Sequence, residues 1–398
     1  MAAGCGDQSR GGVIKGDTLT IFTSVPLQGP HAGQARDIID GEKLALSQAG
    51  GKAGPFNVSF AALDDSAASG SRQPGWGPGK TADNATRAAE DARTIAYVGE
   101  FDSGATAVSL PITNEADFVQ VSPAATAVGL TKLVPGADKG EPDKYYPSGD
   151  RTFARVVPAG DVEASAAASW AKQLGIRSVF LVGDKSVSGD GQVKQFRVAA
   201  DRIGELKIVG EKGMDPRADR YRAFAKEVAS KDPDLVYFGG GVESNAVKFW
   251  KDLAAGVPRA RLMGTSGLLT PDFYGAIGSA GGRTFLTSAT EDESRLPAAG
   301  KRVLRDFSRQ FRRSPGPYAA YGHAAMSLLL DAIKRAGDSA DERRRIVDEV
   351  FSTEGFRSAV GTFSIDDNGD TTLNRIAGYT IRNGKLRLVR PLTGQPSG

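Results

Sequence analysis

The sequence predicts an α/β protein with two lobes, each formed by a parallel β-sheet covered by helices. Short apolar segments typical of buried strands alternate with longer segments typical of helices, and this alternation occurs twice along the chain. With 398 residues the chain is too long for one ordinary hydrophobic core, and its 50 glycines fit many tight turns. Long helical segments return after the second alternation. We therefore expect the chain to pack back on the first lobe and to leave a cleft between the lobes.

In the first half of the chain, predicted strands end in polar or glycine residues and lead into predicted helices. Strands are expected at residues 18–26, 57–63, 96–99, 118–121 and 152–158, and helices at 35–48, 81–93 and 105–115. Ser103 or Gly104 is expected to cap the last of these helices. Residues 66–79 and 129–151 are rich in glycine, proline and polar residues, which predicts surface loops. The strand at 152–158 is expected to carry the chain to the second lobe.

From residue 161 the alternation repeats. Strands are expected at residues 178–183, 207–210, 235–238, 261–264 and 284–289, and helices at 162–174, 191–202, 218–230 and 244–255. The last strand is expected to return the chain to the first lobe, where helices at 299–311, 317–336 and 341–351 follow. Strand signals at 361–365 and 375–389 close the chain, and Asn383-Gly384 predicts a hairpin turn in the second of them.

The composition argues against several classes of function. Fifty basic and 47 acidic residues give a net charge of +3, which offers no electrostatic case for nucleic-acid binding. No apolar stretch approaches the roughly 20 residues of a membrane span. A single cysteine excludes an intrachain disulfide and cysteine-rich metal sites, and the two histidines, His31 and His323, leave little material for acid–base or metal chemistry. We therefore expect no catalysis, no cofactor and no metal.

The N-terminal residues predict a membrane anchor. Small residues followed by Cys5 form the pattern that ends a bacterial lipoprotein signal, in which the cysteine thiol receives a lipid. The polar residues after Cys5 are expected to be flexible, so that residues 1–17 form a tether. An extracytoplasmic location at a membrane surface follows from this interpretation.

Two hydroxyl-bearing loops in residues 96–126 predict a binding site. Ser103 follows one predicted strand and Thr126 follows the next, so both are expected at the same edge of the sheet, where α/β proteins bind ligands. Ser103 also lies at a helix start, whose free N–H groups favour an anion. The loops are interpreted as a cradle for a small carboxylate. The alternative is that both side chains only cap local structure.

Three other motifs could indicate an enzyme instead of a binding protein. Gly239-Gly240-Gly241 lies between a predicted strand and a helix, but the spacing lacks the third glycine of a dinucleotide fingerprint. Residues 366–370 are rich in aspartate, yet no glutamate follows at the twelfth position of a calcium loop, so a turn is expected. Asp64 and Asp65 could bind a metal, but paired acids at a strand end more often contact the adjacent loop.

Short motifs in a characteristic order between residues 18 and 389 point to a family. They are Pro26-Leu27-Gln28-Gly29-Pro30, Asp40-Gly41, Leu63-Asp64-Asp65, Gly99 with Ser103, Val121-Ser122-Pro123-Ala124-Ala125-Thr126, Tyr146-Pro147, Phe153-Ala154-Arg155-Val156-Val157-Pro158, Gly183-Asp184, Tyr237-Phe238-Gly239-Gly240 and Gly316-Pro317-Tyr318-Ala319-Ala320-Tyr321-Gly322. This series resembles the type I periplasmic binding proteins of branched-chain amino acid ABC transporters.

The resemblance implies two Rossmann-like lobes joined by three crossing strands, which close on a ligand by hinge motion. We expect one lobe at residues 18–156 and 289–358 and the other at 157–288 and 359–398. It also implies a set of ligand-binding residues, with the carboxylate at Ser103 and Thr126 and a backbone contribution near Ala124. The full set expected is Ser103, Gly104, Ala124, Thr126, Gln34, Asp184, Ser188, Gly241, Glu243 and Ser266.

The chain departs from the pattern of this family at three expected site positions. Amino-acid binders commonly carry an acid near Ser266, which holds the ligand ammonium, and an aromatic residue near Ser188 or Gly241. The small residues here imply more space and a bulkier or more polar ligand, and an α-amino acid would need Asp184 or Glu243 to replace the missing acid. In addition, Asp102 stands where some relatives have half of a disulfide.

These observations predict an extracytoplasmic solute-binding protein that delivers a small polar, carboxylate-bearing ligand, such as an amino acid or organic acid, to an ABC permease. A receptor subunit that senses a ligand with the same cleft is one alternative. An α/β enzyme that uses Asp64 and Asp65, or the Gly239 loop, with a metal or nucleotide is another.

Overall fold

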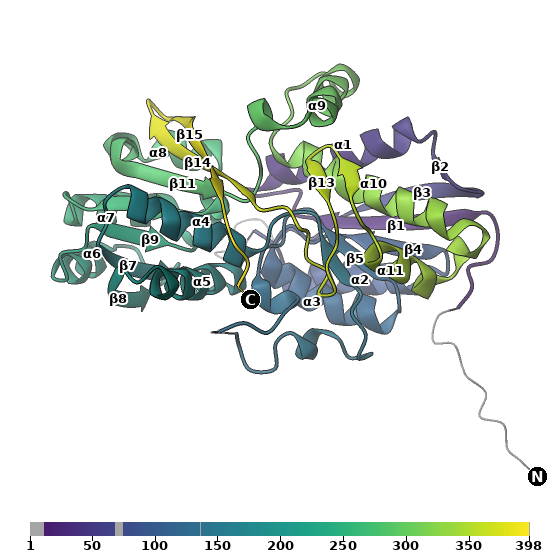
Figure 1. The fold of residues 1–398 in the computed structure, drawn as a ribbon, viewed down its shortest axis with the longest axis horizontal. Coiled ribbons are helices and arrows are strands. Elements are labelled where there is room, and N and C mark those ends of the chain that lie inside the picture. Colours follow the sequence, from purple (N-terminus) through teal and green to yellow (C-terminus); the bar gives the residue numbers. More distant parts are fainter. Residues whose placement is uncertain (1–11, 68–74, 136, 398) are drawn as a thin grey trace, which may run out of the picture.

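The protein folds into two lobes, each built on one β-sheet, in a computed structural model that describes residues 12–67, 75–135 and 137–397 (Figure 1). The first sheet has the strand order β2-β3-β1-β4-β5-β6. Its strands are β1 (Thr18–Val25), β2 (Lys52–Ala53), β3 (Phe56–Asp64), β4 (Thr94–Val98), β5 (Val119–Ser122) and β6 (Phe153–Arg155). The central strands are almost entirely buried, because helices cover both faces of a parallel sheet.

Within the described residues, six α-helices belong to the first lobe. They are α1 (Ala32–Gln48), α2 (Pro78–Glu90), α3 (Ser103–Glu115), α9 (Ala298–Phe311), α10 (Tyr318–Ala336) and α11 (Arg343–Phe351). Helix α2 packs along α3, whereas α1 packs along α10, which returns from the second lobe. Glycine permits the close approach of α1 and α10, since a Cβ on Gly41 would lie 2.2 Å from the carbonyl oxygen of Ala319. The predicted return of the C-terminal helices to the first lobe is confirmed.

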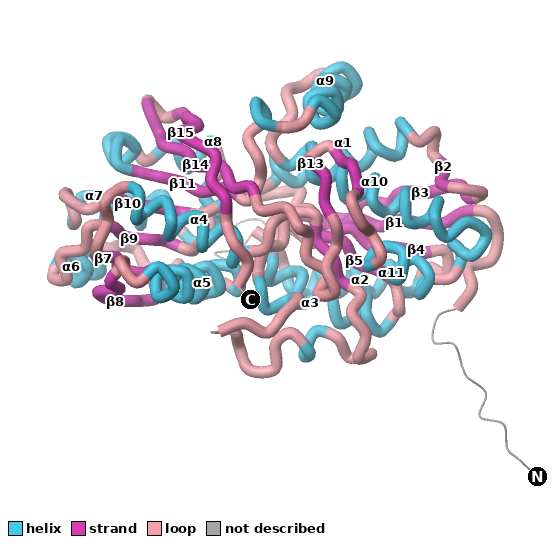
Figure 2. Tube along the Cα trace, in the orientation of Figure 1, coloured by secondary structure: helices cyan, strands magenta, loops and turns pink. Residues whose placement is uncertain are grey.

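The second sheet has the order β15-β14-β11-β10-β9-β7-β8. Its strands are β7 (Ser178–Gly183), β8 (Lys207–Gly213), β9 (Leu235–Phe238), β10 (Arg261–Gly264), β11 (Thr284–Ser288), β14 (Arg375–Arg382) and β15 (Lys385–Thr393). The helices around it are α4 (Gly160–Gln173), α5 (Val187–Ile203), α6 (Arg222–Ala229), α7 (Ala246–Gly256) and α8 (Pro271–Ala276). Figure 2 shows both sheets with helices on either side.

Within the described residues the chain passes between the lobes three times, at residues 156–159, 289–297 and 364–374. The predicted two-lobed fold with three connections is therefore confirmed. The sheets are not wholly parallel as predicted, because the edge strand β2 pairs antiparallel with β3, and β14 pairs antiparallel with both β11 and the edge strand β15. The predicted hairpin at Asn383-Gly384 joins β14 to β15. A second small hairpin, β12 (Phe356–Ser358) with β13 (Gly361–Phe363), spans the expected lobe boundary after residue 358, and the division into segments stays a prediction.

The strand order places one side of each lobe at the cleft. In the first sheet the chain leaves β1 for β3 on one side and later adds β4 on the other, so the order reverses between β1 and β4. In the second sheet it reverses in the same way between β7 and β9. Loops that leave the carboxyl ends of strands at such a reversal diverge and form a crevice.

Two expectations about local structure are wrong. Helix α3 begins at Ser103, and Asp102, the residue before it, makes no capping hydrogen bond, so neither Ser103 nor Gly104 caps the helix. The expected tether is ordered from Val13 onward, because Val13 forms a β-bridge with Glu342 and Ile14 is buried. Cys5, the expected lipidation site, lies outside the described residues. No helix among the described residues is long and apolar enough to span a membrane.

Candidate functional site

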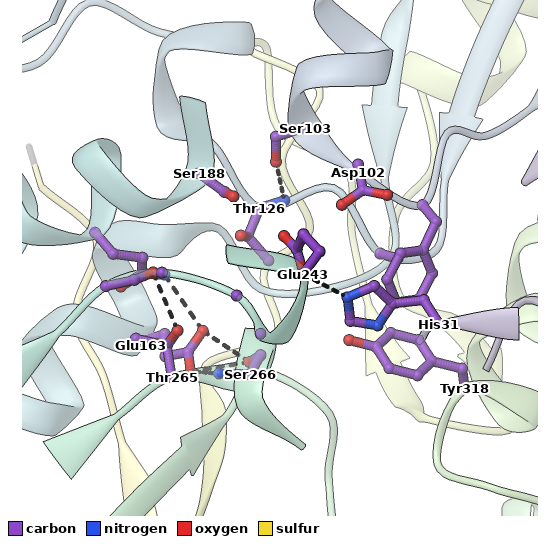
Figure 3. Close-up of a pocket in the computed structure, with 17 residues that line it drawn as sticks. His31, Asp102, Ser103, Thr126, Glu163, Ser188, Glu243, Thr265, Ser266 and Tyr318 are labelled. Carbon is purple, nitrogen blue, oxygen red and sulfur yellow. Dashed lines mark hydrogen bonds and ion pairs between the residues drawn. The ribbon is translucent and has the colours of Figure 1, made fainter. Parts of the chain in front are cut away.

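A pocket lies between the two lobes, at the reversal points of both sheets (Figure 3). It contains about 530 Å³ of empty space, part of it open to solvent. The first lobe contributes His31, Phe101, Asp102, Ser103, Ala124, Thr126 and Tyr318, and the second contributes Glu163, Ser188, Gln192, Gly239, Gly240, Gly241, Glu243, Thr265, Ser266 and Gly267. Polar groups therefore face each other across a narrow space, with one wall from each lobe.

The Ser103 hydroxyl organises the wall of the first lobe. Its Oγ accepts hydrogen bonds from the backbone N–H groups of Thr126 (3.1 Å) and Ala127 (3.0 Å), which fixes the loop after β5 against the start of α3. Among the described residues the Ser103 hydroxyl donates to no acceptor, and the Thr126 hydroxyl makes no hydrogen bond. Both O–H groups line the pocket and are available to a ligand.

Glu163 organises the wall of the second lobe from the first turn of α4. Its carboxylate accepts hydrogen bonds from Ser266 N and Oγ and from Thr287 Oγ1, each at 2.9 Å, and from Gln192 Nε2 at 3.3 Å. Burial raises the pKa of Glu163, while these donors counteract the increase. The loop after β10 is thereby held at a fixed position. Ser266, where the resemblance implied an acid, is hydrogen-bonded to the carboxylate of Glu163 instead.

The three glycines after β9 are required by packing. A Cβ on Gly239 would lie 2.3 Å from the carbonyl oxygen of Gly189, and one on Gly240 would lie 2.5 Å from the Asp184 carboxylate. A Cβ on Gly241 would lie 2.3 Å from Oε1 of Glu243. Close contacts within the chain therefore account for this run. At Gly241 the neighbouring group is the end of the Glu243 side chain, so the expectation of extra space there stays a prediction.

Two polar contacts connect the lobes at the pocket. His31 Nε2 lies 2.9 Å from Glu243 Oε2, and Gln34 Nε2 donates to the carbonyl oxygen of Leu269 at 3.1 Å. Gln34 Oε1 also contacts His31 Nδ1 at 2.7 Å. Burial alone would lower the pKa of His31, but the hydrogen bond and charge of Glu243 raise it to about 9. His31 is therefore protonated at neutral pH and forms an ion pair across the cleft.

Asp102 differs from the other carboxyl groups of the pocket. Its side chain accepts no hydrogen bond from any residue that the structure describes, and its Oδ2 is buried. Burial raises the pKa of Asp102 to about 8, and the nearby Glu243 contributes to the increase. Figure 3 shows the Asp102 carboxyl group on the side of the pocket where Ser103 and Thr126 lie.

Seven of the ten residues expected at the site line this pocket: Ser103, Ala124, Thr126, Ser188, Gly241, Glu243 and Ser266. Gly104 instead packs against Trp76, and Gln34 contacts His31 behind the pocket wall. Asp184 is buried, and it accepts hydrogen bonds from the Ser186 and Ser244 hydroxyls and from Gly241 N. It shapes the loops of the second lobe and is already satisfied.

Sequence reasoning missed His31, Asp102 and Glu163. His31 was expected to be an ordinary loop residue, although its position after β1 places it at the reversal point. Asp102 directly precedes Ser103, and this adjacency could have identified it. Glu163 lies on a helix, and no sequence motif marked it as a site residue. Asp64 accepts hydrogen bonds from Leu27 N and Ser66 N, as expected for a loop contact. No group of three or more potential metal ligands occurs among the described residues.

Comparisons with known proteins agree with this architecture. The model of a family described as periplasmic binding protein matches residues 18–385. An amino acid binding protein of Pseudomonas aeruginosa is 22% identical over 300 residues, covering 75% of this chain and 73% of that protein. A leucine binding protein of Thermotoga maritima has a TM-score of 0.79 at 21% identity, covering 94% of this chain and 99% of that one. A solute binding protein of an R. palustris ABC transporter, solved with 4-hydroxybenzoate, has a TM-score of 0.77 at 18% identity, covering 96% and 98%.

Proposed function

This chain belongs to the periplasmic binding protein family, and on that premise we propose that it binds a small carboxylate-bearing solute for an ABC importer. The observation that carries the proposal is the pocket between the lobes, which is lined by Ser103 and Thr126, whose O–H groups donate to no acceptor among the described residues. Neutral O–H donors held on a rigid loop suit a carboxylate, because hydrogen bonds to a charged acceptor are stronger than those between neutral groups.

Capture involves closure of the lobes and no covalent step. The three connections between the lobes provide a hinge, and groups of both lobes must approach the ligand to remove it from water. We place the protein outside the cytoplasm, attached through a lipid on Cys5, where it delivers its ligand to a membrane permease. The amino acid binding relative and the neighbour solved with 4-hydroxybenzoate support a ligand of this size and charge.

A binding screen tests the proposal. Thermal unfolding is followed in the presence of amino acids, aliphatic and aromatic carboxylates, the corresponding amides, neutral sugars and nucleotides, since a ligand of the native state raises the unfolding temperature. Carboxylate-bearing compounds should stabilise the protein, and the effect should be lost in Ser103→Ala with Thr126→Val. Ser47→Ala, which changes an exposed serine on α1, is the control. Stabilisation by amides, sugars or nucleotides alone would contradict the proposal.

A further inference from the structure

We infer that the ligand carries a protonated amine beside its carboxylate, and that Asp102 binds this amine. The inference rests on the proposed function, because it names the class of solute for the same pocket. It assigns cation recognition to the first lobe, on the residue directly before Ser103, whereas the expected position of the acid was in the second lobe near Ser266.

Three carboxyl side chains line the pocket, and only one lacks protein donors. Glu163 accepts hydrogen bonds from Ser266, Thr287 and Gln192. Glu243 is paired with His31 at 2.9 Å. Asp102 accepts none within the described part of the chain, and its Oδ2 is buried. An ionised carboxylate with a buried oxygen and no donor is costly unless a ligand supplies the donor.

The charges of the pocket favour a cationic donor over a neutral one. His31 offsets Glu243, whereas the described pocket residues include no second cation beside Asp102, so that its carboxyl group stays largely protonated at neutral pH until a cation pairs with it. A ligand with only a carboxylate would add a negative charge to a pocket whose described lining residues include one cation, His31. A protonated amine at Asp102 would compensate the carboxylate of the ligand, because a buried charge is tolerated when it is paired.

The geometry limits the separation of the two ligand groups. Asp102 is adjacent in sequence to Ser103, and both side chains line the same end of the pocket as Thr126 (Figure 3). One small molecule can therefore place its carboxylate at the hydroxyls of Ser103 and Thr126 and its amine at Asp102. The phenyl rings of Phe101 and Tyr318, whose centroids are 5.1 Å apart, supply an apolar surface next to these groups. Amino acids combine the three features.

The test compares ligands that differ only in the amine. Calorimetric titrations use the amino acids that stabilise the protein most, each beside its deamino analogue: leucine with 4-methylpentanoate, phenylalanine with 3-phenylpropanoate, and 4-aminobutanoate with butanoate. We expect at least about tenfold weaker binding of each deamino analogue, the effect typical of a hydrogen bond to a charged group. Asp102→Asn should reduce the affinity for the amino acids by about the same factor and leave the affinity for the deamino analogues unchanged or higher.

Asp83→Asn, which changes an exposed acid on α2, is the matched control and should retain wild-type affinity. The unfolding temperature of each ligand-free variant establishes that it is folded. Equal affinity for both members of each pair, or full retention of amino acid binding in Asp102→Asn, would overturn the inference and leave the proposed function standing. If no compound of either class binds the wild-type protein, the proposed function fails and the inference fails with it.

Discussion

Replacing Glu243 by glutamine should remove the proton that His31 carries at neutral pH. The side chains of His31 and Glu243 come from different lobes and meet at 2.9 Å. Burial favours the neutral imidazole, and the pKa of His31 is raised to about 9 chiefly by the hydrogen bond and charge of Glu243, with smaller contributions from Asp102 and Gln34. Glutamine keeps the size of the side chain and an oxygen that can accept from the ring, but it removes the charge. Burial then dominates, and the pKa of His31 should fall below 6.5.

The magnitude follows from proton linkage. A rise in pKa from 6.5 to about 9 on folding corresponds to about 3 kcal/mol of stabilisation. Because the pKa of the folded state is the higher one, this stabilisation is complete below pH 6.5 and is lost as the pH rises through 9. The free energy of unfolding of wild type relative to Glu243→Gln should therefore fall by about 3 kcal/mol between about pH 6 and pH 10. The Asp102 carboxyl group also makes the folded protein less stable as the pH rises, because Glu243 contributes to its raised pKa.

Nuclear magnetic resonance of the imidazole rings measures the effect directly, because the chain has only two histidines. His31 should titrate near pH 9 in the wild-type protein, and His323, whose pKa burial lowers to about 4, should titrate far from it. A His31→Gln variant assigns the two signals. If the His31 ring titrates near 6.5 in both wild type and Glu243→Gln, the ion pair across the cleft does not form and the reasoning is refuted.

Three further substitutions test the packing and the site. Ser103→Ala should weaken carboxylate binding about tenfold, as measured by calorimetry. It should also lower the free energy of unfolding in urea by about 1–3 kcal/mol, because the backbone N–H groups of Thr126 and Ala127 lose their acceptor. Gly41→Ala should cost about 1–3 kcal/mol in urea unfolding, since its Cβ would meet α10, whereas Gly33→Ala on the same helix, with nothing within 4 Å, should cost nothing; equal effects would contradict the packing argument. Arg155→Met should cost about 1–3 kcal/mol, because the buried guanidinium donates to Asp370 at 2.7 Å and to the Ala125 and Ala127 carbonyl oxygens, while Lys132 still pairs with Asp370; an unchanged midpoint in urea would show that these bonds contribute little.

Local patterns predicted most of the fold. Strands β7, β9 and β10 occupy the predicted residues, because short apolar segments bounded by polar turns are unambiguous in a buried parallel sheet. The elements that were missed, β2, β12 and α8, are short, and their apolar periodicity is too brief to recognise. The antiparallel pairing of the predicted β14–β15 hairpin with β11 was missed for a different reason. Strand direction depends on which neighbour a segment pairs with, and pairing is not local.

The candidate site was predicted in part for a similar reason. Ser103, Ala124 and Thr126 follow strands of the first sheet, so their position at the cleft could be inferred from chain order alone. Asp184 also follows a strand, but its carboxylate already accepts hydrogen bonds from the hydroxyls of Ser186 and Ser244. These contacts could not be predicted from the sequence pattern.

By itself, then, the sequence determined the two-lobed α/β architecture and the edge of each sheet where a ligand would bind, because hydrophobic periodicity and turn residues act over a few positions. Only the tertiary structure decided which polar groups at that edge remain free. Glu163 is satisfied by residues more than 100 positions away, His31 and Glu243 pair across 212 positions, and Asp102 is left without a donor in the described chain. Such assignments depend on how two separately predicted lobes come together, and that is a property of long-range packing.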